Sequence, residues 1–301
     1  MRSSMSSVLT KVAIPRTPKL SKAKGKTWIL PLPTGTASIM SDNLSTVRFK
    51  LGPPPICKMS RFNYLCRPRL KRPVLIAGLP GIANIGKLAA EYLIHKLRTT
   101  KFAELYSEHF PEWAIQENGT LKTIKMDFFR ARPSKLKHDL ILATADAQAA
   151  TPVGQYVLTG EILDFAKKHG VEFVVTMAAY VLSQNEPLNR TVVGAASDSE
   201  LSKLLKDNGV SLLDGGMIVG MNGLLPALAA SRGMRGFCVL GTTKGGLLDA
   251  RASEAILRAL QSMFGFDIDL RELHQHALSL PRLKPSALKL PSFEEEPSYI
   301  R

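Results

Sequence analysis

The sequence predicts an α/β domain with a mostly parallel sheet and helices on both faces. From residue 73 onwards, short β-branched runs alternate with helical stretches, the order expected of a parallel sheet joined by crossover helices. Several of these runs are apolar at nearly every position, as expected of strands covered on both faces. With 301 residues, 45% of them hydrophobic, the chain can fill a sizeable core.

The first half of the pattern starts with a strand and the helix that follows it. VLIAG at residues 74–78 has the composition of a buried strand, and apolar residues at helical spacing predict a helix over residues 83–98. ENGT at 117–120 marks a turn, so the extended segments on either side of it predict a hairpin. The extended segments expected in this half are 102–107, 113–116 and 122–129.

The second half continues the alternation. HDLILATAD at 138–146 is a buried strand, and a helix from about residue 153 ends at KKHG, where cations and Gly170 suit a helix C-terminus. Ser197 and Glu200 have the spacing of a capping box, which predicts the start of another helix. The remaining elements expected are strands at 171–178 and 236–241 and a helix at 249–265.

Positive charge is concentrated at the start of the chain. Residues 1–72 hold 15 lysines and arginines against one acidic residue, Asp42, whereas residues 73–301 hold 25 against 24. A basic groove within the fold is therefore not expected, and only the leading segment could attract nucleic acid. We expect a basic, disordered extension at 1–69, the α/β domain at 70–280 and a proline-rich tail at 281–301.

The extension admits three interpretations. Its lack of acidic residues before Asp42 and its content of serine and basic residues suit a transit peptide, and it could equally be a basic arm. We favour a third interpretation, in which it is an upstream segment and the working start is Met40 or Met59.

Composition disfavours several other classes of protein. No run approaches the roughly 18 apolar residues of a membrane span, so we expect no membrane contact. Cys57, Cys66 and Cys238 are too few and too scattered for a disulfide framework or a zinc site, which suits the reducing cytoplasm. Because no Ser, Cys or His stands in a recognisable catalytic context, we expect no catalytic residue, no metal and no cofactor.

The turn after the first strand resembles a phosphate-binding loop. Gly81, Gly86 and Lys87 have the spacing G-x-x-x-x-G-K, but Leu88 stands where such a loop needs a Ser or Thr to hold magnesium. We favour a structural glycine turn, in which Gly78 and Gly81 permit a tight strand-to-helix connection and Gly86 lets the helix lie close to its neighbour. Lys87 is then a solvated helix lysine.

Polar residues near strand ends leave a ligand-binding alternative open. Asp146 and Gln148 follow a buried strand, at the sheet edge where α/β folds place ligands. Together with Lys87, Asn222 and Lys244, they could form a pocket for a small anionic ligand or a nucleotide, as in an enzyme or a sensor. Turn and capping roles are the alternative for the same residues.

Five segments resemble the second family of proteasome assembly chaperones, particularly its archaeal branch, and they follow the family's order. They are PVLIAGLPGIANIGKLAAEYLI, YSEHFPEWAIQENG, PVGQYVLTGEILDFAKKHGVEF, VGAASDSEL and GGMIVGMNGLLPALAASRGMRGFCVLGTT. The resemblance covers about residues 70–275. It implies a three-layer α/β domain similar to nucleoside phosphorylases. It also implies self-association and a role in assembling proteasome α subunits, with no catalysed reaction.

The tail departs from the pattern of the proteasome-binding members, which end with a hydrophobic residue, a tyrosine and one final residue. This chain ends Tyr299-Ile300-Arg301, with its tyrosine one place too early. Docking through these three residues and an unemployed disordered tail both remain open. Our leading hypothesis is a non-catalytic, self-associating scaffold that binds protein partners, possible clients being proteasome α subunits.

Overall fold

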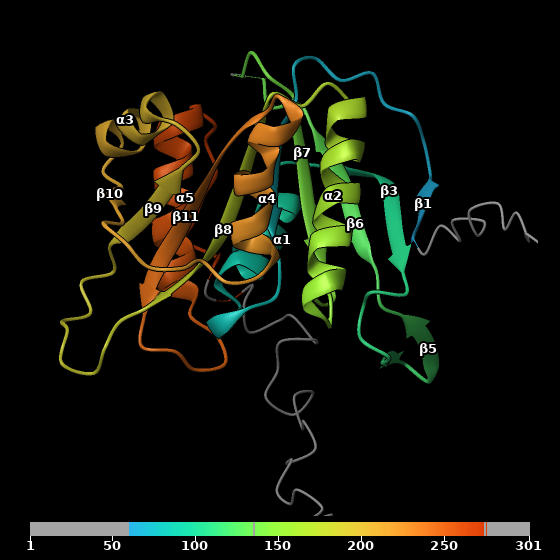
Figure 1. Ribbon diagram of the computed structural model, residues 1–301, viewed down its shortest axis with the longest axis horizontal. Helices are drawn as coiled ribbons and strands as arrows, with labels where there is room; N and C mark the ends of the chain where they lie inside the picture. The colour runs from blue at the N-terminus through green and yellow to red at the C-terminus, as the bar shows by residue number, and fades with distance from the viewer. Residues whose placement is uncertain (1–59, 135, 274, 276–301) are drawn as a thin grey trace, which may run out of the picture. The chain divides into compact units, whose positions relative to one another are not determined.

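Nine strands form one mixed sheet in the computed structural model, which describes residues 60–134, 136–273 and 275 (Figure 1). The strand order is β1-β3-β6-β7-β2-β8-β11-β9-β10. The strands of this sheet are β1 (Ser60–Tyr64), β2 (Val74–Gly78), β3 (Thr100–Ser107), β6 (Met126–Ala131), β7 (Leu140–Ala145), β8 (Phe173–Val181), β9 (Val192–Ala196), β10 (Ser211–Leu212) and β11 (Arg235–Thr243).

The parallel part of the sheet is its centre. Strands β7, β2, β8 and β11 run parallel to one another, while β6 pairs antiparallel with β7 and β9 pairs antiparallel with β11. Every residue of β2 and β7 is buried, in agreement with their uninterrupted apolar sequences. The predicted α/β class is therefore confirmed, with a parallel centre and antiparallel margins.

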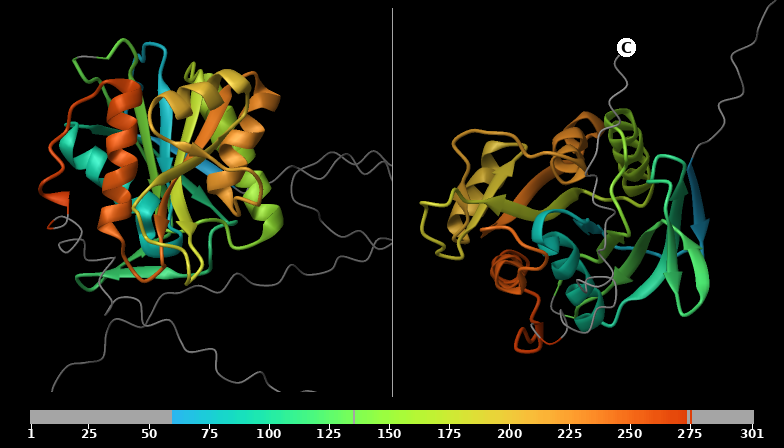
Figure 2. Two further views of the ribbon diagram at one scale, coloured as in Figure 1. Left: turned by 90° about the vertical axis from the view of Figure 1, so that its left-hand side faces the viewer. Right: turned by 90° about the horizontal axis from the view of Figure 1, so that it is seen from below.

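Helices cover both faces of the sheet and make three layers (Figures 1 and 2). Helices α1, α3 and α5 pack on one face, which receives Val74 and Ile76 of β2. Helices α2 and α4 pack on the other face, which receives Leu75 and Ala77. The helices are α1 (Ile85–Lys96), α2 (Pro152–Lys168), α3 (Ser199–Asp207), α4 (Met221–Ala229) and α5 (Ala250–Phe264).

Helix α1 begins two residues later than predicted. Ala83 and Asn84 have φ angles of 51° and 49°, in the left-handed region, so the α-helix starts only at Ile85. The predicted strands at 74–78, 102–107, 138–146, 171–178 and 236–241 correspond to β2, β3, β7, β8 and β11, and the helices at 153 and 249 to α2 and α5.

The predicted hairpin is present as β4 (Ala114–Glu117) and β5 (Thr120–Thr123). Asn118 and Gly119 form its turn with φ angles of 49° and 79°, as in the type I′ turns that suit two-residue hairpins. The single strand expected at 122–129 is wrong, because the chain leaves the hairpin after Thr123, buries Ile124 and enters the main sheet as β6.

The capping box predicted for α3 is displaced by one residue. Asp198, not Ser197, caps the helix, and its carboxylate accepts a hydrogen bond of 3.0 Å from the Leu201 N–H. The Ser197 hydroxyl instead accepts from the Gly236 N–H, and Glu200 pairs with Arg235 at 3.0 Å. The two residues that the local pattern assigned to the cap, Ser197 and Glu200, therefore bond β11 in the folded protein.

Strand β1 lies inside the segment assigned to the basic extension. Its five residues pair antiparallel with β3, and the ring of Phe62 stacks on Phe165 of α2 with centroids 4.7 Å apart. The expected domain boundary at residue 70 is therefore wrong. The tail residues Tyr299, Ile300 and Arg301 lie outside the described residues.

Helix α4 contains a proline, and no helix was predicted there. Pro226 cannot donate the hydrogen bond that a helix would direct to the carbonyl oxygen of Asn222. The Thr176 hydroxyl of β8 donates to this oxygen instead, at 2.5 Å. The sheet thus satisfies the backbone group that Pro226 leaves free.

Candidate functional site

A groove lies at the carboxyl ends of the parallel strands, between the turn after β2 and residues 213–220. Its cavity of about 550 Å³ is lined mainly by apolar and glycine residues together with the amide side chains of Gln148, Gln155 and Asn222. None of the described residues that line it is charged. We name this cavity the edge groove.

Two predicted site residues, Gln148 and Asn222, lie in the edge groove and serve mainly to join elements. The Gln148 amide donates to the Pro80 carbonyl oxygen at 2.6 Å and accepts from the Met221 N–H at 2.8 Å. It therefore ties the turn after β2 to the start of α4. Asn222 is 4% exposed, and its backbone oxygen is the one that Thr176 bonds.

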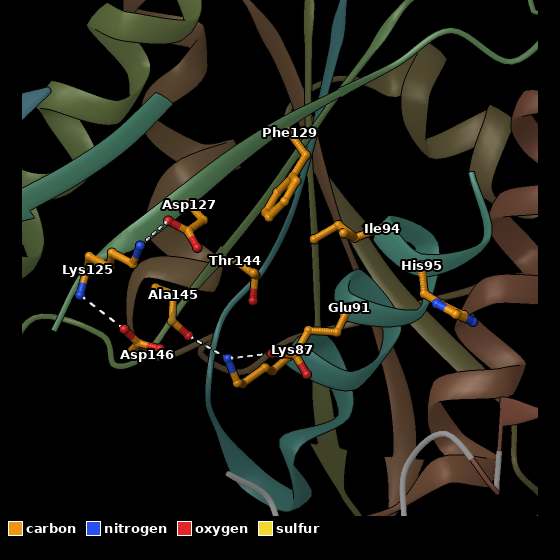
Figure 3. Close-up of a pocket in the computed structure, with 10 residues that line it drawn as sticks. All are labelled: Lys87, Glu91, Ile94, His95, Lys125, Asp127, Phe129, Thr144, Ala145 and Asp146. Atoms are coloured by element: carbon orange, nitrogen blue, oxygen red, sulfur yellow. Dashed lines mark hydrogen bonds and ion pairs between the residues drawn. The ribbon is translucent and has the colours of Figure 1, made fainter. Parts of the chain in front are cut away.

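Lys87 does not point into the edge groove, and its expected solvation is wrong. Only 4% of the residue is exposed. Its ammonium group donates to the carbonyl oxygen of Ala145 at 2.9 Å and pairs with Glu91 at 2.8 Å (Figure 3). The first turn of α1 lies so close to the sheet that this side chain must cross the end of β7.

The close packing of α1 explains the two essential glycines of the turn. A Cβ atom on Gly86 would lie 2.0 Å from the Met177 carbonyl oxygen of β8, and one on Gly78 would lie 2.0 Å from the Gly86 carbonyl oxygen. Gly81 differs, because a Cβ there would meet nothing closer than 3.9 Å. The backbone around Gly86 therefore packs against β8. In a phosphate loop, the corresponding backbone would instead surround an anion.

Lys87 and Asp146 line a second cavity on the face that α1 covers. This cavity of about 330 Å³ lies between α1 and strands β6 and β7, and we name it the charged pocket (Figure 3). Its lining residues are Lys87, Glu91, Ile94, His95, Lys125, Asp127, Phe129, Thr144, Ala145 and Asp146.

An ion-pair network borders the charged pocket, and the sequence did not reveal it. Glu104 of β3 accepts hydrogen bonds from Lys125 at 2.5 Å and from Lys101 at 3.0 Å. Burial by itself raises the pKa of Glu104, but bonds from Lys125, Lys101, Asn63 and Tyr106 outweigh it and hold the pKa at about 2. Lys101 and Tyr106 are near Glu104 in the sequence, but Asn63 of β1 and Lys125, just before β6, are 41 and 21 residues away, so local spacing could not indicate the whole network.

Lys244 occupies a third place. Its ammonium group donates to the carbonyl oxygens of Gln184 at 3.1 Å and Glu186 at 2.6 Å, and also to that of Ser183. It thereby closes the loop after β8. The structure does not bring the five predicted ligand residues into one pocket: Gln148 and Asn222 line the edge groove, Lys87 and Asp146 the charged pocket, and Lys244 neither.

Within the described residues, no group of three His, Cys, Asp or Glu side chains is placed to hold a metal ion. Cys238 lies in β11 and is buried, and this burial raises the pKa of its thiol to about 12, with a hydrogen bond involving Thr176 acting in the opposite direction. Such a thiol is not an activated nucleophile. No helix among the residues that the structure describes has the length and apolar character needed to cross a membrane.

Comparison with known proteins gives consistent matches over this domain. A model of the PAC2 family matches residues 75–282. The uncharacterized protein MJ1210 of Methanocaldococcus jannaschii is 34% identical over 230 residues, which cover 75% of this chain and 86% of that protein.

Two solved structures from Pyrococcus furiosus extend the comparison. PbaB, an archaeal proteasome activator, is 34% identical with a TM-score of 0.68, covering 73% of this chain and 95% of that chain. PbaA, an archaeal homolog of proteasome-assembly chaperone, is 26% identical with a TM-score of 0.61, covering 72% of this chain and 87% of that chain.

Proposed function

Because the chain belongs to the PAC2 family, we propose that it is a non-catalytic scaffold that self-associates in the cytoplasm and binds proteasome α subunits. The resemblance to proteasome assembly chaperones, inferred from five sequence segments, is confirmed by the family match and by the likeness to PbaA and PbaB. Self-association and the identity of the client are the proposal.

The observation that carries the proposal is a set of exposed apolar side chains near the edge groove. Val153, Tyr156 and Val157 stand at positions i, i+3 and i+4 of α2, so they share one face of the helix, and they are 70%, 59% and 37% exposed. Met217 and Val219 are 92% and 83% exposed. We name these five residues the apolar end.

The two parts of the apolar end differ in their relation to the edge groove. Met217 and Val219 line the groove, and α2 contributes Gln155 to it, whereas Val153, Tyr156 and Val157 lie on another face of α2. Large apolar side chains that stay exposed in this number are typical of a protein-binding site. A helix stripe of this kind can pack against a second helix or fill a groove of a partner.

The test replaces the centre of the helix stripe. We expect Tyr156→Asp to weaken self-association by about tenfold or more, because a charge would be buried at the contact. Sedimentation velocity measures assembly, and pull-down measures the binding of α subunits. The control is Leu65→Ser, which changes a 52% exposed leucine next to β1 and should alter neither. If Tyr156→Asp also alters neither, the apolar end is not the contact.

The tail is tested separately, since it could act as a tethered peptide. Deleting Tyr299 to Arg301 should weaken the pull-down of α subunits and leave sedimentation unchanged. Loss of both activities would place the tail within the assembly contact. Loss of neither would show that the early tyrosine is no docking motif.

A further inference from the structure

We propose that the charged pocket binds a small organic monocation with an apolar stem, such as an alkylguanidinium or alkylammonium ion. This site is independent of the apolar end, because α1 and α2 cover opposite faces of the sheet. It is therefore separate from the proposed protein contact.

Two buried oxygen atoms in the charged pocket lack a hydrogen-bond partner among the described residues. They are Thr144 Oγ1 and Asp127 Oδ1. Thr144 is 9% exposed, and a buried hydroxyl without a partner costs folding free energy. Asp127 Oδ1 has Lys125 Nζ at 3.3 Å as an ion-pair partner but accepts no hydrogen bond.

These two oxygen atoms come from neighbouring positions of the sheet. Asp127 of β6 and Thr144 of β7 are register partners in an antiparallel pair, so their side chains lie beside each other on one face (Figure 3). A ligand that carries N–H donors can supply a hydrogen bond to an oxygen atom that accepts none from the protein. A guanidinium or ammonium group has such donors, and a carboxylate or phosphate has none.

Charge in the pocket favours a cation. Its lining holds two lysines, Lys87 and Lys125, against three carboxylates. Both lysines are already engaged, Lys87 by Ala145 and Glu91 and Lys125 by Glu104 and Asp127. Lys101, outside the lining, pairs with Asp127 at 3.4 Å and with Glu104 at 3.0 Å, so counting Lys101 and Glu104 together leaves the excess of one negative charge unchanged. One additional positive charge would balance the lining, whereas an anion would add to the excess of negative charge.

The pocket also has an apolar wall. Phe129 and Ile94 stand beyond Asp127 and Thr144 and can contact an aliphatic stem (Figure 3). The volume of about 330 Å³ suits a ligand of modest size. A monocation with a short alkyl chain fits the polar and the apolar parts together.

The experiment titrates the full chain with probes that share a butyl stem. At constant ionic strength, n-butylguanidinium and n-butylammonium should bind saturably, with Kd values of about 1 mM or tighter, and should raise the melting temperature. Butyrate and 1-butanol carry the same stem without the cation and should do neither. Equal effects of all four probes, or no binding by any, would mean that the pocket holds only water.

Two variants locate the binding. Asp127→Asn should weaken the binding of n-butylguanidinium by about tenfold, since it removes the charged acceptor. Thr144→Val keeps the shape of the side chain and removes the unpartnered hydroxyl. It should weaken the binding of n-butylguanidinium severalfold, while the variant without ligand melts at the same temperature as the unsubstituted protein or at a higher one. Unchanged affinity in Thr144→Val would overturn the site even if Asp127→Asn fails to fold.

Glu104→Gln is the matched control. It removes one negative charge from the same network, but Glu104 does not line the pocket, so affinity should stay within about twofold. A loss of affinity as large as that in Asp127→Asn would show that the probe responds to the overall charge of the region and does not bind a specific site. Acetyl-arginine amide tests the source of the cation: weaker binding than n-butylguanidinium supports a free small molecule, and tighter binding overturns that assignment.

Discussion

Lys87 has an environment that its place in the sequence does not suggest. A lysine in the first turn of an exposed helix is usually solvated, but here the fold places the side chain against the carbonyl oxygen of Ala145, and Glu91 pairs with it one turn along the helix. Ala145 belongs to β7, a strand 58 residues further along the chain. The residue that resembled the lysine of a phosphate loop thus fastens α1 to the sheet.

We expect Lys87→Ala to lower the free energy of unfolding by about 2–4 kcal/mol. The change leaves the Glu91 carboxylate and the Ala145 carbonyl oxygen without a donor and opens a cavity under α1. Urea unfolding at neutral pH measures the loss. Lys122→Ala is the control, because that lysine is 50% exposed in its pair with Glu117 and should cost less than about 0.5 kcal/mol. Equal costs would refute the structural role of Lys87.

Helix α1 contacts the sheet directly through its backbone at Gly86, in addition to the side chains that it buries. Gly86 rests against Met177 of β8, and Gly78 rests against Gly86 itself. This approach brings the apolar face of α1, including the fully buried Leu88 and Tyr92, into the core of its layer. The two glycines therefore allow the helix to approach strands β2 and β8 closely.

Gly86→Ala should destabilise the protein by about 3 kcal/mol or more. Its Cβ atom would overlap a backbone oxygen, which cannot move aside as a flexible side chain could. Thermal and urea unfolding measure this effect. In Gly160→Ala of α2, the new atom meets only the end of Arg232 at 3.1 Å, so stability should remain equal or rise by up to about 1 kcal/mol. Similar losses in both variants would refute the close-packing argument.

The whole sheet extends beyond its parallel centre, and three of its outer strands, β1, β9 and β10, were not predicted from the sequence. β1 and β3 form one margin, and β9 and β10 form the other. Phe62 and Tyr64 of β1 reach over this margin to the ring of Phe165, with centroids 4.7 and 6.0 Å away. The first strand therefore links the sheet margin to α2.

A comparison of two truncated chains tests this link. The free energy of unfolding should be about 3 kcal/mol lower for the chain that begins at residue 70 than for the chain that begins at residue 60. The shorter chain lacks the pairing of β1 with β3 and the rings of Phe62 and Tyr64. Differential scanning calorimetry of both proteins measures the difference. Equal melting temperatures would show that β1 contributes nothing to the domain.

Sequence patterns alone were enough to predict the α/β class, the central strands, helices α2 and α5, and the hairpin turn at Asn118 and Gly119. These features follow from local causes: apolar runs, helical spacing and the few residues that tolerate left-handed backbone. The sequence also indicated the family, because five segments preserve the order of a known pattern.

The tertiary structure alone decided the burial of Lys87, the network around Glu104 and the division of the expected pocket into three places. The long-range partners in these sites are 21 to 58 residues apart: Glu104 with Lys125, Glu104 with Asn63, and Lys87 with Ala145. Their distances depend on how α1, β3 and β6 are placed on the sheet. Local periodicity carries no information about such placement. Only the packed layers determine which charges meet and which backbone atoms leave no room for a Cβ atom.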